Sequence, residues 1–91
     1  MCGFAGYMLN DSETRNEHEI LKSMTSVIDH RGPDDFGSWL DSRKCFGFAH
    51  RRLAIIELSA AGHQPMASAC GRFVLAFNGE IYNHLQLRAQ L

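Results

Sequence analysis

Apolar positions recur at helical spacing in one early stretch of the chain. Between residues 17 and 29 they lie on a single face of a helix. These positions are Ile20, Leu21, Met24, Val27 and Ile28. Asn16 suits the helix N-cap, and Gly32-Pro33 follows the stretch, so we expect the helix to stop near His30.

Short apolar runs on either side of this helix predict strands. Residues 3–9 are apolar, contain two glycines and are typical of a buried strand, and the polar residues 10–16 predict a loop. Residues 36–40 and 45–50 predict two strands of a hairpin joined by the polar residues 41–44.

The second half of the chain gives a less regular pattern. Residues 52–57 continue or follow the second hairpin strand, residues 58–66 predict an irregular segment, and residues 72–77 are strongly β-like. Asn78-Gly79 then predicts a turn. Residues 83–91 predict the start of a helix with no stop signal, which indicates a truncated domain. The order of elements is thus β, α, several β, then α.

Composition narrows the class of protein. The chain has 91 residues, a length that suits one small domain, with 45% hydrophobic and 21% charged residues, as in soluble globular proteins. A net charge of −1 gives no sign of a nucleic-acid or membrane partner. No apolar run approaches the roughly 18 residues of a membrane span, and no signal peptide is evident. We therefore expect a cytoplasmic protein.

Cysteines and histidines show no metal spacing. The three cysteines, Cys2, Cys45 and Cys70, form no C-x-x-C motif, so we expect reduced thiols, with Cys45 and Cys70 as small buried hydrophobic residues. The five histidines lack the H-E-x-x-H pattern, and no glycine-rich phosphate loop occurs. We expect structural histidines, and no metal or cofactor in this chain.

Cys2 has the chemistry of an N-terminal nucleophile. If Met1 is removed, Cys2 carries a thiol with a usual pKa of about 8.5 and an α-amine with one of about 7.7–8.0. The amine can take the thiol proton and later protonate a leaving amine, so one residue supplies nucleophile and base. On its own, a cysteine at position two is weak evidence for a catalytic role.

Other residue types suit the same reaction. The Asn78 side chain and the Gly79 N–H are donors that could stabilise an oxyanion, although Asn-Gly is also the strongest hairpin-turn signal. Arg52 could hold a carboxylate with two parallel hydrogen bonds, or Arg51 and Arg52 could form a solvated strand edge. Glu80 could accept a hydrogen bond from substrate, or be a surface charge.

Five blocks in this order resemble a known family. They are Cys-Gly-Phe-Ala-Gly at 2–6, His-Arg-Gly-Pro-Asp-Asp at 30–35, Phe-Ala-His-Arg-Arg-Leu-Ala-Ile at 48–55, Gln-Pro at 64–65 and Phe-Asn-Gly-Glu-Ile-Tyr-Asn-His at 77–84. The chain is similar to the N-terminal domain of glutamine-hydrolysing asparagine synthetases. These are class II glutamine amidotransferases, within the N-terminal-nucleophile hydrolases.

The resemblance implies a fold and a set of roles. The fold would be α+β, a four-layer αββα sandwich, only partly present in these 91 residues. Cys2 would be the nucleophile, with Asn78 and Gly79 as the oxyanion hole. Arg52 would bind the glutamine α-carboxylate, and Glu80 would orient the substrate. The backbone of Leu53, Ala54, Ile55 and Ile56 would line the pocket, and the loop at 31–35 would form a structural wall.

The resemblance also implies missing parts. The family's domain is longer, with a later acidic residue for the substrate α-amine, and it feeds ammonia to an ATP- and Mg²⁺-dependent synthetase domain. We therefore expect a fragment that is inactive alone and self-associates through an unpaired sheet edge. Two alternatives stay open. The domain could have lost catalysis, or it could serve an acceptor carboxylate other than aspartate.

Overall fold

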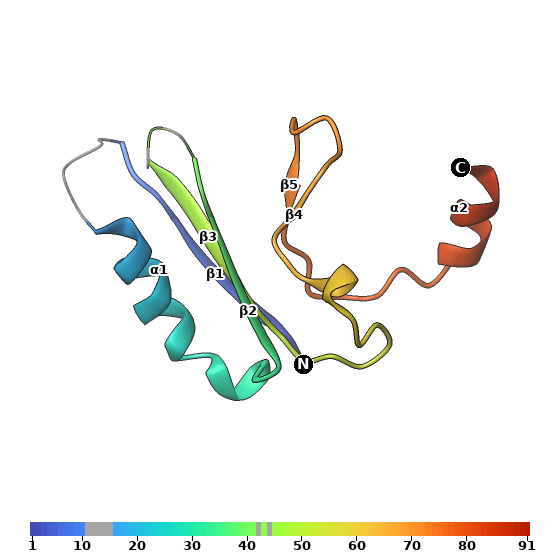
Figure 1. Ribbon diagram of the computed structural model, residues 1–91, viewed down its shortest axis with the longest axis horizontal. Helices are drawn as coiled ribbons and strands as arrows, with labels where there is room; N and C mark the ends of the chain where they lie inside the picture. Colours follow the sequence, from blue (N-terminus) through green and yellow to red (C-terminus); the bar gives the residue numbers. More distant parts are fainter. Residues whose placement is uncertain (11–15, 42, 44) are drawn as a thin grey trace.

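The structure is a small α+β arrangement of two sheets and two α-helices (Figure 1). This computed structural model describes residues 1–10, 16–41, 43 and 45–91, so residues 11–15, 42 and 44 of the predicted loops lie outside it. The elements are β1 (Gly3–Met8), α1 (Glu17–Ser26), the 3-10 turn η1 (Asp29–Arg31), β2 (Asp35–Leu40), β3 (Phe46–Arg52), the 3-10 turn η2 (Ala60–Gly62), β4 (Met66–Ala67), β5 (Val74–Leu75) and α2 (His84–Gln90). The predicted α+β class is confirmed.

The larger sheet has the antiparallel order β1-β3-β2. The predicted hairpin is confirmed as β2 and β3, and its second strand extends to Arg52. The strand ends there because the next hydrogen bond to the neighbouring segment is made by a side chain and not by the backbone. Asp34 N–H donates to Arg52 O at 3.0 Å, but Ala54 N–H donates to the Asp34 carboxylate at 2.8 Å. Residues 53–57 therefore leave the sheet.

Helix α1 covers one face of this sheet. Leu21 of the helix and Ala49 of β3 are fully buried and form the centre of the core. The Asn16 side chain accepts a hydrogen bond from Glu19 N–H at 3.4 Å, which confirms the predicted N-cap. The helix ends at Ser26, four residues before the predicted stop near His30, because 3-10 hydrogen bonds follow it and η1 begins at Asp29.

The opposite face of the sheet is only partly covered. The β4–β5 hairpin lies on this side in Figure 1, while Phe4 and Met8 of β1 are 54% and 77% exposed. The prediction of a buried first strand is therefore wrong, since β1 is an edge strand covered on the α1 side alone. None of the described helices is both long enough and apolar enough to cross a membrane.

The later elements are shorter than the sequence indicates. The β-like run at 72–77 forms only the two-residue strand β5, because its partner β4 is equally short. No strand follows Gly79, and the chain runs on irregularly to α2. The prediction of a hairpin turn at Asn78-Gly79 is therefore wrong, whereas the predicted terminal helix is confirmed.

Candidate active site

Cys2 lies beside the end of β3. Because β1 and β3 are antiparallel, with Gly3 opposite Arg51, the residue before β1 falls next to the residues that leave the sheet. The Leu53 N–H donates to the Cys2 sulfur at 3.2 Å, and the same sulfur lies 3.6 Å from Leu53 O. The thiol is half-buried and fixed at this position.

Arg52 is buried, with 8% of its surface exposed, so the alternative of a solvated strand edge is wrong for this residue. Its Nη1 donates to Ser59 O at 2.8 Å, and its Nη2 donates to Glu57 O. A Cβ at Gly62 would lie 2.5 Å from Cζ of Arg52, so the guanidinium requires glycine there. The loop after β3 thus wraps the guanidinium.

A cavity of about 310 Å³ brings most of the predicted site residues together. It is lined by Cys2, Arg52, Leu53, Ile55, Ile56, Glu57, Gly62, Gln64, Met66, Gly79 and Glu80. A thiol, a guanidinium and a carboxylate therefore share one concave site, although they come from three separate parts of the sequence.

Ala54 and Asn78 are the predicted site residues that do not line this cavity. Ala54 N–H is engaged by Asp34, which places the loop at 31–35 against the strand end, as expected for a wall. Asn78 is half-buried, and its side chain makes no hydrogen bond within the described part of the chain. A Cβ at Gly79 would lie 2.7 Å from the Phe77 ring, so a larger residue there would displace that ring.

Four lining residues were missed by sequence reasoning. They are Glu57, Gly62, Gln64 and Met66. Gln64 has a visible role, because its Oε1 accepts a hydrogen bond from Phe77 N–H at 2.6 Å and so holds the segment that leads to Gly79. In the sequence, the Gln64-Pro65 block and Gly62, two residues before it, could have indicated that this segment lines the site.

His50 is a buried neighbour of the site. It is fully buried, and neither ring nitrogen has a hydrogen-bond partner of good geometry among the described residues. Burial lowers the pKa of His50 below its usual value, and the Phe77 backbone and the Asp35 carboxylate offset this only in part. The imidazole is therefore held neutral, which suits the expected structural role.

The cysteines are free thiols. Cys70 is exposed and Cys45 is half-buried, so the expected burial is wrong for Cys70, which lies between the short strands β4 and β5. The Ser68 hydroxyl, 3.3 Å from the Cys70 sulfur, lowers the pKa of that thiol. Cys70 is thus a second accessible thiol that labelling experiments must separate from Cys2.

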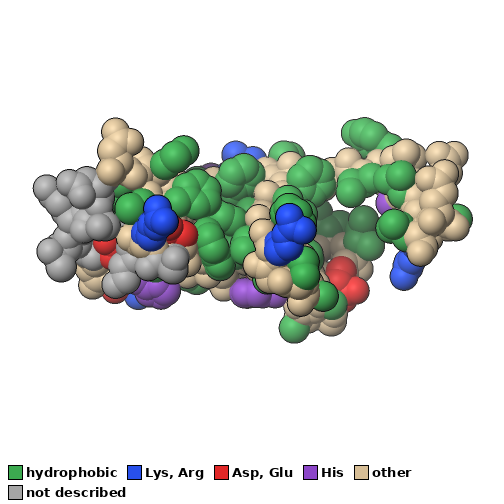
Figure 2. All heavy atoms as spheres, turned by 90° about the horizontal axis from the view of Figure 1, so that it is seen from above, with side chains coloured by type: hydrophobic (Ala, Val, Ile, Leu, Met, Phe, Trp, Pro, Cys, Tyr) green, Lys and Arg blue, Asp and Glu red, His purple; other side chains and the backbone are tan. Residues whose placement is uncertain are grey.

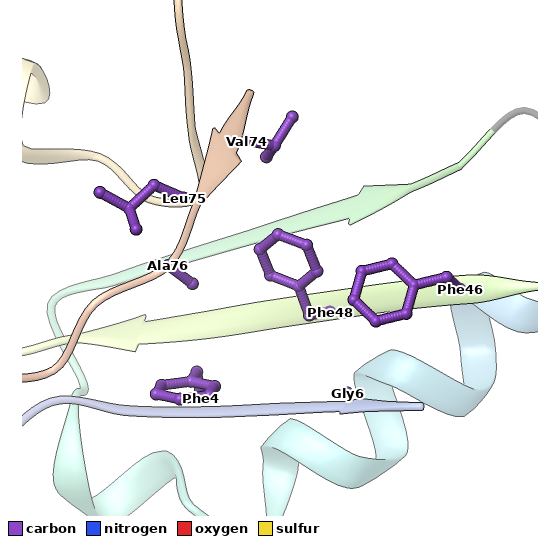
Figure 3. Close-up of a pocket in the computed structure, with 7 residues that line it drawn as sticks. All are labelled: Phe4, Gly6, Phe46, Phe48, Val74, Leu75 and Ala76. Atoms are coloured by element: carbon purple, nitrogen blue, oxygen red, sulfur yellow. The ribbon is translucent and has the colours of Figure 1, made fainter. Parts of the chain in front are cut away.

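Two further cavities flank these features. One, of about 470 Å³, lies between the open sheet face and β5, and Figure 3 shows Phe4, Phe46 and Phe48 around it. The described residues that line it are apolar side chains and one glycine. The other, of about 480 Å³, shares Ile56, Gly79 and Glu80 with the Cys2 cavity. Within the described residues, no cluster of three or more His, Cys, Asp or Glu side chains could hold a metal ion.

A family model described as a glutamine amidotransferase domain matches residues 1–91. The chain belongs to the glutamine amidotransferase domain family. It is 41% identical over 93 residues to asparagine synthetase [glutamine-hydrolyzing] 1 of Bacillus subtilis, and 44% identical over 94 residues to that organism's asparagine synthetase [glutamine-hydrolyzing] 2. It is also 38% identical over 90 residues to asparagine synthetase [glutamine-hydrolyzing] 1 of Saccharomyces cerevisiae.

These matches cover 99–100% of the chain but only 12–15% of each relative. Compared with the relatives, this glutamine amidotransferase domain sequence is therefore a fragment. The sequence resemblance to the asparagine-synthetase group is confirmed.

Proposed function

We propose that Cys2 hydrolyses glutamine to glutamate and ammonia in the cavity that it shares with Arg52 and Glu80. The observation that supports the proposal is that Cys2, Arg52 and Glu80 line one cavity in a chain of the glutamine amidotransferase domain family. Arg52 suits the α-carboxylate of glutamine, because its buried guanidinium donates hydrogen bonds to backbone carbonyls and forms no ion pair with a carboxylate of the described residues.

The reaction begins with removal of Met1, which frees the α-amine of Cys2. The amine takes the thiol proton, and the sulfur attacks the side-chain carboxamide carbon of glutamine. The Gly79 N–H and the Asn78 side chain stabilise the oxyanion; Asn78 must turn toward the cavity to do so. The C–N bond then breaks, the proton held by the amine passes to the leaving nitrogen, and ammonia departs from a thioester.

Water completes the cycle. The amine of Cys2 accepts a proton from water as the oxygen attacks the thioester carbon, and the C–S bond then breaks. The sulfur regains a proton, and glutamate leaves. Glu80, exposed at the cavity, orients the substrate in this scheme.

The ammonia would pass to a synthetase part beyond these 91 residues, with aspartate as the acceptor that the relatives' names suggest. ATP and Mg²⁺ belong to that part in the proposal. The absence of a phosphate-binding loop from this sequence supports placing them there.

Glutaminase activity of the full-length protein that carries this chain tests the proposal. We expect release of glutamate and ammonia from glutamine, and a loss of about 10⁴-fold or more in C2A, because the nucleophile is gone. The matched control C70A, at the other accessible thiol, should retain wild-type activity. Full activity in C2A would refute the proposal.

A further inference from the structure

Asp35 stands directly opposite Arg52 in the sheet. The two residues are register partners on β2 and β3, so their side chains lie on the same face. Both also line a cavity of about 260 Å³, together with His63. Opposite charges at directly facing positions normally pair, and Asp35 is therefore the natural ion-pair partner of Arg52.

The observed pairing is different. Asp35 Oδ2 lies 2.6 Å from Nδ1 of His63, and Asp35 Oδ1 accepts a hydrogen bond from Phe36 N–H at 2.8 Å. Both carboxylate oxygens are thus engaged elsewhere. Across the described ranges, no carboxylate forms an ion pair with Arg52, whose donors reach backbone carbonyls instead.

The fold places His63 for this contact. Its backbone N–H donates to Ala60 O at 3.0 Å and closes η2. Its ring packs against β2 at Gly37, where a Cβ would lie 2.7 Å from His63 Nε2. The imidazole is therefore built against the strand beside Asp35, although its side chain is 47% exposed.

We propose that His63 is a positioning residue that holds the Asp35 carboxylate away from Arg52 and so keeps the guanidinium charge available for the substrate carboxylate. This inference rests on the proposed glutaminase function. An Asp35–Arg52 ion pair would compete directly with glutamine, because each carboxylate needs the same donors. The effect belongs to substrate binding and not to the chemical step.

Steady-state glutaminase kinetics of the full-length protein test this inference. His63→Phe keeps an aromatic ring against Gly37 but removes the donor, and we expect KM for glutamine to rise about tenfold with kcat within about twofold of wild type. His63→Asn restores a donor near the position of Nδ1 and should recover most of the affinity. His18→Ala, on the exposed side of α1, is the matched control.

The double variant H63F/D35N is decisive. Asparagine at 35 keeps the oxygen that accepts Phe36 N–H but carries no charge, so we expect KM to return to within about threefold of wild type. A double variant as weak as H63F, or an H63F enzyme with unchanged KM, would overturn the proposal. A fall in kcat alone would also overturn it, because an unchanged KM means that glutamine binding does not depend on His63.

Failure of the proposed function would give results that differ from those of a failed positioning role. Wild-type protein without glutaminase activity, or an active C2A variant, would reject the proposed function and not the positioning role. A crystal structure of H63F then decides, because the inference predicts Arg52 nitrogens within about 4 Å of the Asp35 carboxylate. An Arg52 side chain that still reaches Glu57 O and Ser59 O would contradict it.

Discussion

The guanidinium of Arg52 is buried, yet its hydrogen bonds within the described part of the chain go to backbone carbonyls of the loop that follows its strand. This arrangement depends on a glycine, since any side chain at position 62 would overlap the guanidinium. At the residue scale, the position of the guanidinium therefore depends on the loop carbonyls and on Gly62 as well as on Arg52 itself.

Gly62→Ala should displace this guanidinium. The new Cβ would come within 2.5 Å of Arg52 Cζ, so the side chain must move and lose its hydrogen bonds to the loop. We expect KM for glutamine to rise by about tenfold or more, because charged hydrogen bonds contribute about 1.5–3 kcal/mol each. Steady-state kinetics check this, with Ala61→Ser as the matched control. An unchanged KM would show that Arg52 does not set affinity.

His50 should make stability depend on pH. Burial lowers its pKa in the folded chain, so below about pH 6.5 the unfolded chain takes up a proton that the folded chain does not. Stability attributable to His50 is therefore fully present above pH 6.5 and falls as the pH drops toward the folded-state pKa. Urea unfolding at pH 7.5 and pH 5 measures this.

His50→Gln removes that titration, so its loss of stability between the two pH values should be smaller than that of wild type. His18→Gln, at an exposed position, should behave as wild type does. An equal pH dependence in H50Q and wild type would contradict a neutral buried imidazole.

At the scale of elements, local patterns predicted well what local forces determine. The α1 helix followed from its apolar face and its Asn16 cap, and the β2–β3 hairpin followed from two strands separated by polar residues. The short β5 did not follow, because strand length depends on a partner, and β4 offers only two residues. The Asn78-Gly79 turn failed for the same reason, since no second strand follows it.

Leu21 is the apolar side chain of α1 that packs most deeply against the sheet. It is fully buried, and Leu21→Ala should lower the free energy of unfolding by about 2–5 kcal/mol, through lost burial and the cavity left behind. Leu85→Ala on α2, where the side chain is 70% exposed, should change it by about 0.5 kcal/mol or less. Equal losses in urea unfolding would mean that α1 does not form the core.

At the scale of the whole molecule, one face of the sheet is open. Figure 2 shows hydrophobic side chains gathered over the middle of the molecule, and Phe4 and Met8 are among the exposed ones. The proximity of Cys2, Arg52 and Glu80 was predicted only from the family resemblance. It depends on how three segments that are distant in the sequence pack against one another. The Asp35–His63 contact had no sequence signal of its own.

The open face and the edge strands β1 and β2 should make this 91-residue chain self-associate. Sedimentation velocity over a hundredfold concentration range should show a rising sedimentation coefficient. Met8→Lys, which places a charge on the exposed edge strand, should weaken the association, whereas Lys22→Arg on α1 should not. A single monomeric boundary for wild type at every concentration would contradict this expectation.

The role of Cys2 is tested by the mass of the full-length protein before and after exposure to a diazo ketone analogue of glutamine, which alkylates nucleophilic thiols. We expect a protein that lacks Met1 and gains one adduct, mapped to Cys2 and blocked by free glutamine, with C70A labelled as wild type is. An adduct confined to Cys70, or a processed protein with no adduct at Cys2, would contradict the assignment of Cys2 as the glutamine nucleophile.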